Sequence, residues 1–118
     1  SGIDISQYCI DNAMKTVKKF CQVGTCDDLP YEDNSFDLVI SVATIHNLDI
    51  TGVKKSIKEI MRVSKNHAYI KVNAHESESE RIAFSNWNLV AKTSLYTHEW
   101  MNIFNEIGYN GEYSWFKP

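Results

Sequence analysis

Short apolar segments alternate along the chain with longer segments in which apolar residues recur every three or four positions. The short segments have the length of β-strands, and the longer ones have the periodicity of amphipathic helices. We expect strands at residues 2–5, 20–24, 36–42, 67–72 and 112–116. We expect helices at residues 6–20, 51–64, 84–90 and 98–107. This alternation favours an α/β fold built on a mostly parallel sheet.

The clearest patterns are those of the strand at residues 36–42 and the helix at residues 6–20. The strand is a nearly continuous apolar run, which is typical of a parallel strand covered on both faces. Ser6 is a suitable N-cap for the helix, and Gly108 is expected to end the last helix. The apolar positions that should turn the first helix toward the sheet are Ile10, Ala13, Met14, Val17 and Phe20.

The composition is that of one globular domain without a membrane span. The chain has 118 residues, 43% of them hydrophobic and 23% charged, and domains commonly have about 100–150 residues. No apolar stretch approaches the roughly 20 residues that cross a bilayer, so no membrane partner is expected. Twelve Lys and Arg against 15 Asp and Glu give a net charge of −3. Without a broad basic field, nucleic acid is disfavoured as a partner.

Cysteine and histidine usage predicts neither a disulfide framework nor a metal site. The cysteines are odd in number and form no Cys-x-x-Cys pair; they are Cys9, Cys21 and Cys26. This usage favours a reducing compartment, the cytoplasm. His75 lies beside three glutamates within residues 76–80, but nothing in their spacing fixes a ligand geometry, so no metal is predicted.

Asp4 is the first candidate for a functional side chain. It stands at the end of a predicted strand and directly before a helix, and open parallel sheets bind ligands at the carboxyl ends of their strands. A carboxylate in this place can accept hydrogen bonds from both hydroxyls of a ribose. The alternative is that Asp4 only caps the helix together with Ser6. Nicotinamide-dinucleotide enzymes use the same device, so the residue alone does not identify the cofactor.

Three segments together are more specific. In residues 23–41, VGTCDDLPYEDNSFDLVIS, a strand end leads through an LP-containing loop into a strand that begins Phe-Asp-Leu-Val. Residues 2–6 read Gly-Ile-Asp-Ile-Ser, and residues 41–48 end in Ile-His-Asn-Leu. These segments and their spacing resemble the class I methyltransferases that depend on S-adenosylmethionine. The resemblance implies a Rossmann-like sheet with flanking helices. The family's first strand and G-x-G-x-G turn would precede Ser1, so we expect an N-terminally truncated domain.

The resemblance also implies a cofactor, S-adenosyl-L-methionine, and a set of residues that bind it. Asp4 would hold the ribose hydroxyls, and Ile5 would lie against the adenine. Thr25 and Cys26 would occupy the adenine edge, although the family commonly has an acidic residue where Thr25 stands. The methionine portion would pass over three residues at the end of the next strand, Ser41, Val42 and Ala43.

His46 has two interpretations. It follows the strand at residues 36–42 and could act as a general base where the methyl group leaves. It could instead pack and hydrogen-bond to hold the loop. We favour the second interpretation because methyl transfer needs mainly proximity and alignment.

We expect one partial domain over residues 1–118, with cofactor-binding residues in 1–73 and substrate-side helices and a last strand in 74–118. Without the first strand of the family, its neighbours would expose unpaired edges, through which two copies could form a homodimer. The function expected is methyl transfer to a small-molecule acceptor. The alternatives are a non-catalytic Rossmann-like binding module and a fragment of a nicotinamide-dependent oxidoreductase.

Overall fold

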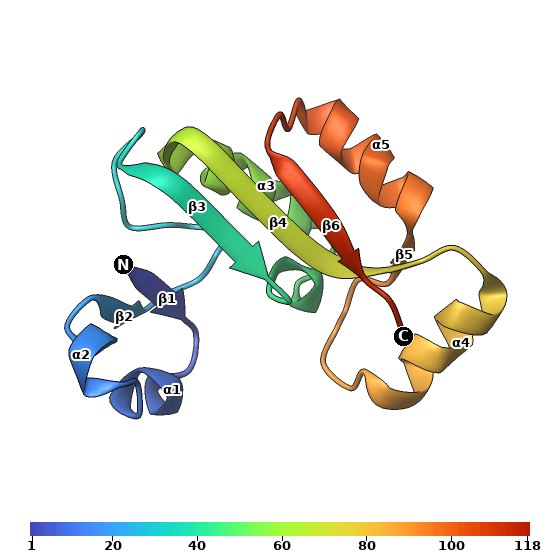
Figure 1. Ribbon diagram of the computed structural model, residues 1–118, viewed down its shortest axis with the longest axis horizontal. Helices are drawn as coiled ribbons and strands as arrows, with labels where there is room; N and C mark the ends of the chain where they lie inside the picture. The colour runs from blue at the N-terminus through green and yellow to red at the C-terminus, as the bar shows by residue number, and fades with distance from the viewer.

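The computed structural model describes residues 1–118, and strands and helices alternate along it (Figure 1). In chain order the elements are β1 (Gly2–Asp4), α1 (Gln7–Asp11), α2 (Lys15–Lys18), β2 (Cys21–Val23), β3 (Phe36–Val42), a 3-10 helix η1 (Ile45–Asn47), α3 (Ile50–Val63), β4 (Ser64–His75), α4 (Glu78–Trp87), β5 (Leu95–Tyr96), α5 (Thr97–Ile107) and β6 (Glu112–Phe116). The expected α/β class is confirmed.

The strands form two sheets in which every pair is parallel. In the smaller sheet β1 pairs with β2, so that Asp4 lies opposite Val23. In the larger sheet β4 is central, because it pairs with β3 on one edge and with β6 on the other. The carboxyl end of β4 also pairs with β5. The boundary expected at residue 73 therefore falls inside a strand that joins the two halves of the chain.

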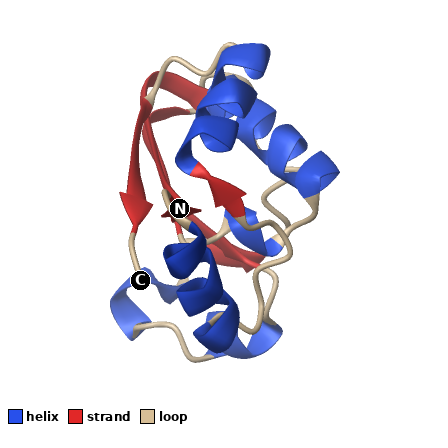
Figure 2. Ribbon diagram, turned by 90° about the vertical axis from the view of Figure 1, so that its right-hand side faces the viewer, coloured by secondary structure: helices blue, strands red, loops and turns tan.

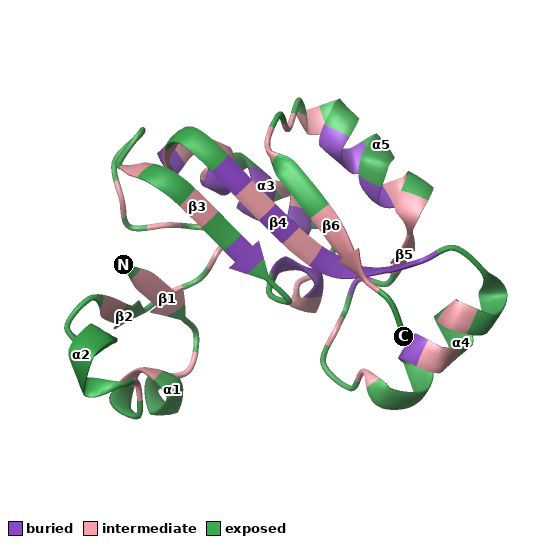
Figure 3. Cartoon of the chain, in the orientation of Figure 1, coloured by how far each residue is buried: buried purple, intermediate pink, exposed green.

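The hydrophobic core lies between the larger sheet and the two long helices. α3 and α5 lie side by side on one face of this sheet, behind it in Figure 1 and to its right in Figure 2. Figure 3 shows that buried positions gather on these elements, and the large buried apolar residues there include Val53, Ile57, Ile60, Ile70, Val72, Trp100 and Phe104. Burying one large apolar side chain contributes about 1.5–3 kcal/mol, so the stability of the fold is concentrated in this layer.

The helix expected at residues 6–20 is interrupted, so this prediction was wrong in its middle. Ser6 caps α1 as expected, since its Oγ accepts a hydrogen bond from the Cys9 amide at 3.2 Å. The side chain of Asn12 then donates to the Tyr8 carbonyl at 2.9 Å. Side chains thus satisfy carbonyls at the end of α1, and an extended residue, Met14, begins α2. This competition between side chain and backbone is a common reason for a helix to stop at Asn.

The apolar side of this segment does not pack on a sheet. Met14, Val17 and Phe20 are exposed, because β1 and β2 have only three residues each and offer no surface wide enough to cover them.

β3 has the predicted bounds but not the predicted covering on both faces. Leu38, Ile40 and Val42 are 59%, 66% and 45% exposed. The helices cover one face of the larger sheet, and the face turned to the viewer in Figure 1 carries none. β3 also pairs with β4 alone and is an edge strand.

In the C-terminal part, α4 begins earlier than the expected residue 84. Ser77 Oγ accepts the Glu80 amide at 3.3 Å, and acidic side chains in the first turn favour a helix start there. α5 ends at Gly108 as expected, with a left-handed φ of 81°. None of the helices combines the length and apolar character needed to cross a membrane.

Candidate functional site

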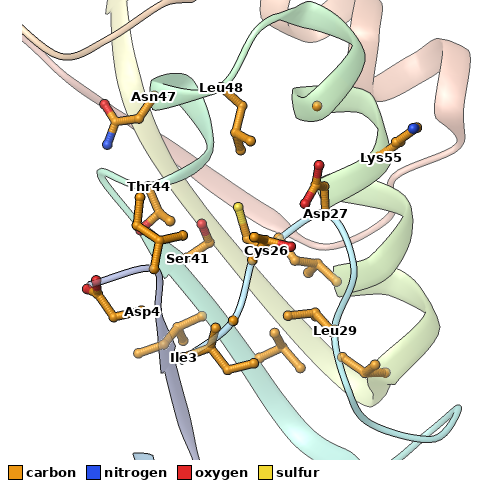
Figure 4. Close-up of a pocket in the computed structure, with 18 of the residues that line it drawn as sticks. Ile3, Asp4, Cys26, Asp27, Leu29, Ser41, Thr44, Asn47, Leu48 and Lys55 are labelled. Carbon is orange, nitrogen blue, oxygen red and sulfur yellow. The ribbon is translucent and has the colours of Figure 1, made fainter. Parts of the chain in front are cut away.

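A cavity of about 960 Å³ lies between the two sheets (Figure 4). Its walls are β1, the loop that follows β2, β3 along its length, and residues of α3 from its first to its last turn. Ligands of open parallel sheets bind in crevices at the carboxyl ends of the strands. The cavity includes the carboxyl ends of β1 and β3 and also extends back along both strands to Gly2 and Phe36.

Asp4 lines the cavity at the end of β1. Its Oδ1 accepts a hydrogen bond from the Ser6 amide at 2.8 Å, and its second oxygen has no hydrogen bond within the chain. The two interpretations of Asp4 are therefore compatible, because one oxygen supports the start of α1 while the other stays free for a ligand. Ile5 is exposed and also lines the cavity.

Thr25 and Cys26 also line the cavity, in the loop after β2, the strand that pairs with β1. A backbone bridge joins Thr25 to Asp28 and makes a tight turn around Cys26. The Cys26 sulfur lies 3.3 Å from the hydroxyl oxygen of Ser56 on α3. Burial raises the pKa of the Cys26 thiol, so the side chain stays neutral near pH 7 and is a poor nucleophile.

Two residues that line the cavity each carry a buried polar atom with no partner within the chain. These atoms are the hydroxyl oxygen of Ser41, near the end of β3, and Oδ1 of Asn47 in η1. The Asn47 side chain is oriented by its Nδ2, which donates to the Ala43 carbonyl at 3.2 Å. Buried polar groups almost always have a hydrogen-bond partner. These two atoms therefore fit a polar ligand that would supply the missing bonds.

Ala43 makes the turn between β3 and η1 with a left-handed φ of 54°. This conformation is costly for a residue other than glycine. The Ala43 amide donates to the Lys71 carbonyl of β4 at 2.9 Å, which ties the strained turn to the sheet. The strain lies at the cavity wall, where functional sites often concentrate it.

His46 lies beneath the cavity wall and is not one of the residues that line it. Its Nδ1 accepts a hydrogen bond from the Asn73 amide at 3.2 Å, and burial lowers the pKa of the imidazole. With Nδ1 occupied as an acceptor, the neutral ring carries its proton on Nε2. The backbone carbonyl of His46 also accepts the Thr93 amide at 3.0 Å. The histidine thus joins η1 to β4 and to the segment before β5.

The structure brings six of the seven expected cofactor residues to one cavity. They are Asp4, Ile5, Thr25, Cys26, Ser41 and Ala43. Val42 is not among the lining residues, although residues from both faces of β3, including Ile40 and Ser41, are. Lining residues that the sequence analysis did not select include Asp27, Thr44, Asn47 and Lys55. Thr44 lies two residues after the end of β3, a signal that could have identified it, whereas Asn47 lies at the end of η1.

The parallel strand pairs, the flanking helices and the cavity at strand ends are those of a Rossmann-like α/β domain. Residues 1–72 match a family model described as a methyltransferase domain. The chain belongs to this family, and the resemblance to class I methyltransferases that depend on S-adenosylmethionine is confirmed.

Relatives and solved structures agree with this assignment. An uncharacterized protein of Haemophilus influenzae is 29% identical over 124 residues, covering 92% of this chain and 48% of that protein. A protein of Encephalitozoon cuniculi described as a putative methyltransferase is 34% identical over 89 residues, covering 64% and 42%. A Thermotoga maritima structure, described as an S-adenosylmethionine-dependent methyltransferase and possible histamine N-methyltransferase, is 25% identical with a TM-score of 0.73 and coverage of 91% and 53%. The chain spans about half the length of the curated relatives it matches.

Proposed function

We propose that the protein containing this chain transfers a methyl group from S-adenosylmethionine to a small-molecule acceptor, and that the cavity receives the cofactor. The observation that supports this best is that Ser41 and Asn47, two residues that line the cavity, each carry an unpartnered buried polar atom, in a chain of the methyltransferase family. Asp4 is an exposed lining residue, and in Figure 4 its carboxylate extends to the outer side of β1, so a ligand that reaches it would have to extend past the end of this strand.

The residues present fit the cofactor. The free carboxylate oxygen of Asp4 would accept hydrogen bonds from the ribose hydroxyls, and Ile5 would lie against the base. Thr25 and the Cys26 backbone would meet the edge of the adenine. Ser41 and Ala43, with the Val42 backbone between them, would lie along the methionine portion. When bound, S-adenosylmethionine supplies a methyl group on a positively charged sulfur, which an O, N or C nucleophile can displace.

The side chains around the cavity support a mechanism that depends on alignment. Burial keeps the Cys26 thiol neutral. The Nδ1 of His46 is already an acceptor for the Asn73 amide, which favours a positioning role for the histidine over that of a general base. Holding the acceptor in line with a reactive methyl group supplies most of what such a reaction needs.

A small-molecule acceptor is favoured by charge. The net charge of −3 gives no broad basic surface for a polynucleotide. The three cysteines are all free thiols, which fits a reducing cytoplasm as the place of action.

Calorimetric titration of the full-length protein with S-adenosylhomocysteine tests the proposal. Asp4→Ala should weaken binding by about 1–3 kcal/mol, the cost of a lost charge-assisted hydrogen bond. Asp11→Asn is the control, because Asp11 is an exposed residue of α1 that does not line the cavity. Its carboxylate accepts a hydrogen bond only from Gln7. The affinity of this control should match that of the wild type.

A parallel titration with NADH addresses the oxidoreductase alternative. Binding of NADH in place of S-adenosylhomocysteine would refute the proposal, as would a wild-type protein that binds neither compound. An affinity unchanged by Asp4→Ala would show that Asp4 serves only the start of α1.

A further inference from the structure

One arginine holds the irregular loop that forms a wall of the cavity. Arg62, in the last turn of α3, donates from Nη1 to the Tyr31 carbonyl at 2.6 Å and to the Asp33 carboxylate at 3.0 Å. Its Nη2 donates to the Leu29 carbonyl at 3.0 Å. The guanidinium also pairs with Glu59, one turn earlier on α3, at 2.7 and 2.8 Å. A planar group with five donors suits such a set of acceptors, whereas a lysine does not.

Glu59 completes the attachment. Its Oε2 accepts a hydrogen bond from the Leu29 amide at 2.8 Å, so the N–H and C=O of Leu29 are both bound to the Glu59–Arg62 pair. The hydrogen bond from Arg62 lowers the pKa of Glu59, which keeps the pair ionised near neutral pH. The Arg62 backbone carbonyl accepts the Asn34 amide at 2.9 Å. Residues 29–34 are thus fixed to the end of α3.

The attached segment belongs to the site. Leu29 and Tyr31 line the cavity, and Thr25, Cys26 and Asp27 line it just before them in the same loop. Figure 4 shows Cys26, Asp27 and Leu29 following one another along the wall. The loop has little regular structure beyond the Thr25–Asp28 bridge, so its course depends on side-chain contacts.

The contacts of Arg62 and Glu59 with residues 29–34 lie outside the hydrophobic core. The eleven buried apolar residues of the core cluster come from η1, α3, β4 and α5, and none comes from residues 27–35. The Tyr31 ring also packs edge-on against Phe36, with centroids 4.7 Å apart. Loss of the guanidinium should therefore loosen the loop while leaving the domain folded.

We propose that Arg62, together with Glu59, is a positioning residue. It holds the 25–31 loop in the place where this loop distinguishes adenine from other bases. This inference rests on the proposed function. Arg62 touches no part of the cofactor; it acts through the loop backbone. Its loss should thus affect recognition of the base more than recognition of the ribose or the amino-acid portion.

The test compares S-adenosylhomocysteine with S-inosylhomocysteine, which differs only in the base, by calorimetry on the full-length protein. The wild type should prefer the adenine compound. Arg62→Ala should weaken the binding of the adenine compound by about tenfold and the binding of the inosine compound by less. The ratio of the two affinities should therefore fall toward one. Arg62→Lys keeps the positive charge but not the planar set of five donors, so it should restore only part of the wild-type affinity ratio.

Lys54→Ala is the matched control. Lys54 lies on the same helix and pairs with Glu106 of α5 at 3.2 Å, away from the loop, so its removal should leave the ratio unchanged. Hydrogen exchange without ligand should become faster at residues 27–34 in Arg62→Ala and stay unchanged in Lys54→Ala.

Equal weakening of both compounds, or an unchanged ratio in a folded Arg62→Ala or Arg62→Lys protein, would overturn the role of Arg62. If the wild type binds neither compound, the proposed function itself fails. The two failures are therefore distinguishable.

Discussion

Replacement of Ser41 by alanine should have opposite effects on folding and on cofactor binding. The Ser41 side chain is 9% exposed and its hydroxyl oxygen has no partner. An unsatisfied buried hydroxyl costs about 1–3 kcal/mol, and a satisfied one contributes about 0.5–1.5 kcal/mol. Ser41→Ala removes the penalty in the free protein, so the free energy of unfolding should stay the same or rise by about 1 kcal/mol. Binding should lose about 1 kcal/mol, which is roughly fivefold in Kd.

Denaturant unfolding and calorimetry with S-adenosylhomocysteine measure the two effects in the full-length protein. Thr93→Val is the control, because Thr93 is equally buried but its Oγ1 donates to the Leu48 carbonyl at 2.6 Å. This variant should lower the free energy of unfolding by about 1 kcal/mol and leave Kd unchanged. A Ser41→Ala protein that is clearly less stable, or that binds S-adenosylhomocysteine as tightly as the wild type, would refute the inference that this hydroxyl hydrogen-bonds a ligand.

Two further predictions concern the C-terminal part. Gly108→Ala should lower the free energy of unfolding by about 1 kcal/mol in a denaturant titration, because the φ of 81° is left-handed. A Cβ at this position would meet no other atom, so the backbone conformation is the whole cost, and unchanged stability would contradict this prediction. Burial raises the pKa of Tyr109 to about 12, which absorbance at alkaline pH should detect. Since the folded protein keeps this proton longer than the unfolded chain, the associated stability is complete below about pH 10 and is lost as pH rises toward 12. Titration of Tyr109 near 10 would contradict the burial.

The sequence predicted the elements whose signals are local. The apolar run of β3 predicted both of its ends, and Gly108 marked the end of α5 because a left-handed residue commonly stops a helix. Asp4 could be selected from its place at a strand end, since parallel sheets bring carboxyl ends together at one edge, whereas Ser41 was selected through the resemblance to methyltransferases.

Features that depend on distant residues could not be predicted. The exposure of Leu38 and Ile40 follows from what packs on β3, and an apolar run has the same sequence pattern whether one face or both are covered. Arg62 meets Leu29 across 33 positions of sequence, and no local pattern distinguishes it from a surface arginine of an amphipathic helix. The break after Asp11 depends on side-chain bonds that compete with the helix, which apolar spacing does not report.

The open edge of β3 has a consequence for the behaviour of this chain in solution. Its outer backbone groups pair with no strand, and Leu38, Ile40 and Val42 form an apolar stripe beside them. Such an edge attracts any extended peptide that can complete the ladder, including an identical molecule. At rising concentration, an isolated chain of these 118 residues should therefore self-associate through this stripe before the helix-covered layer loses its packing.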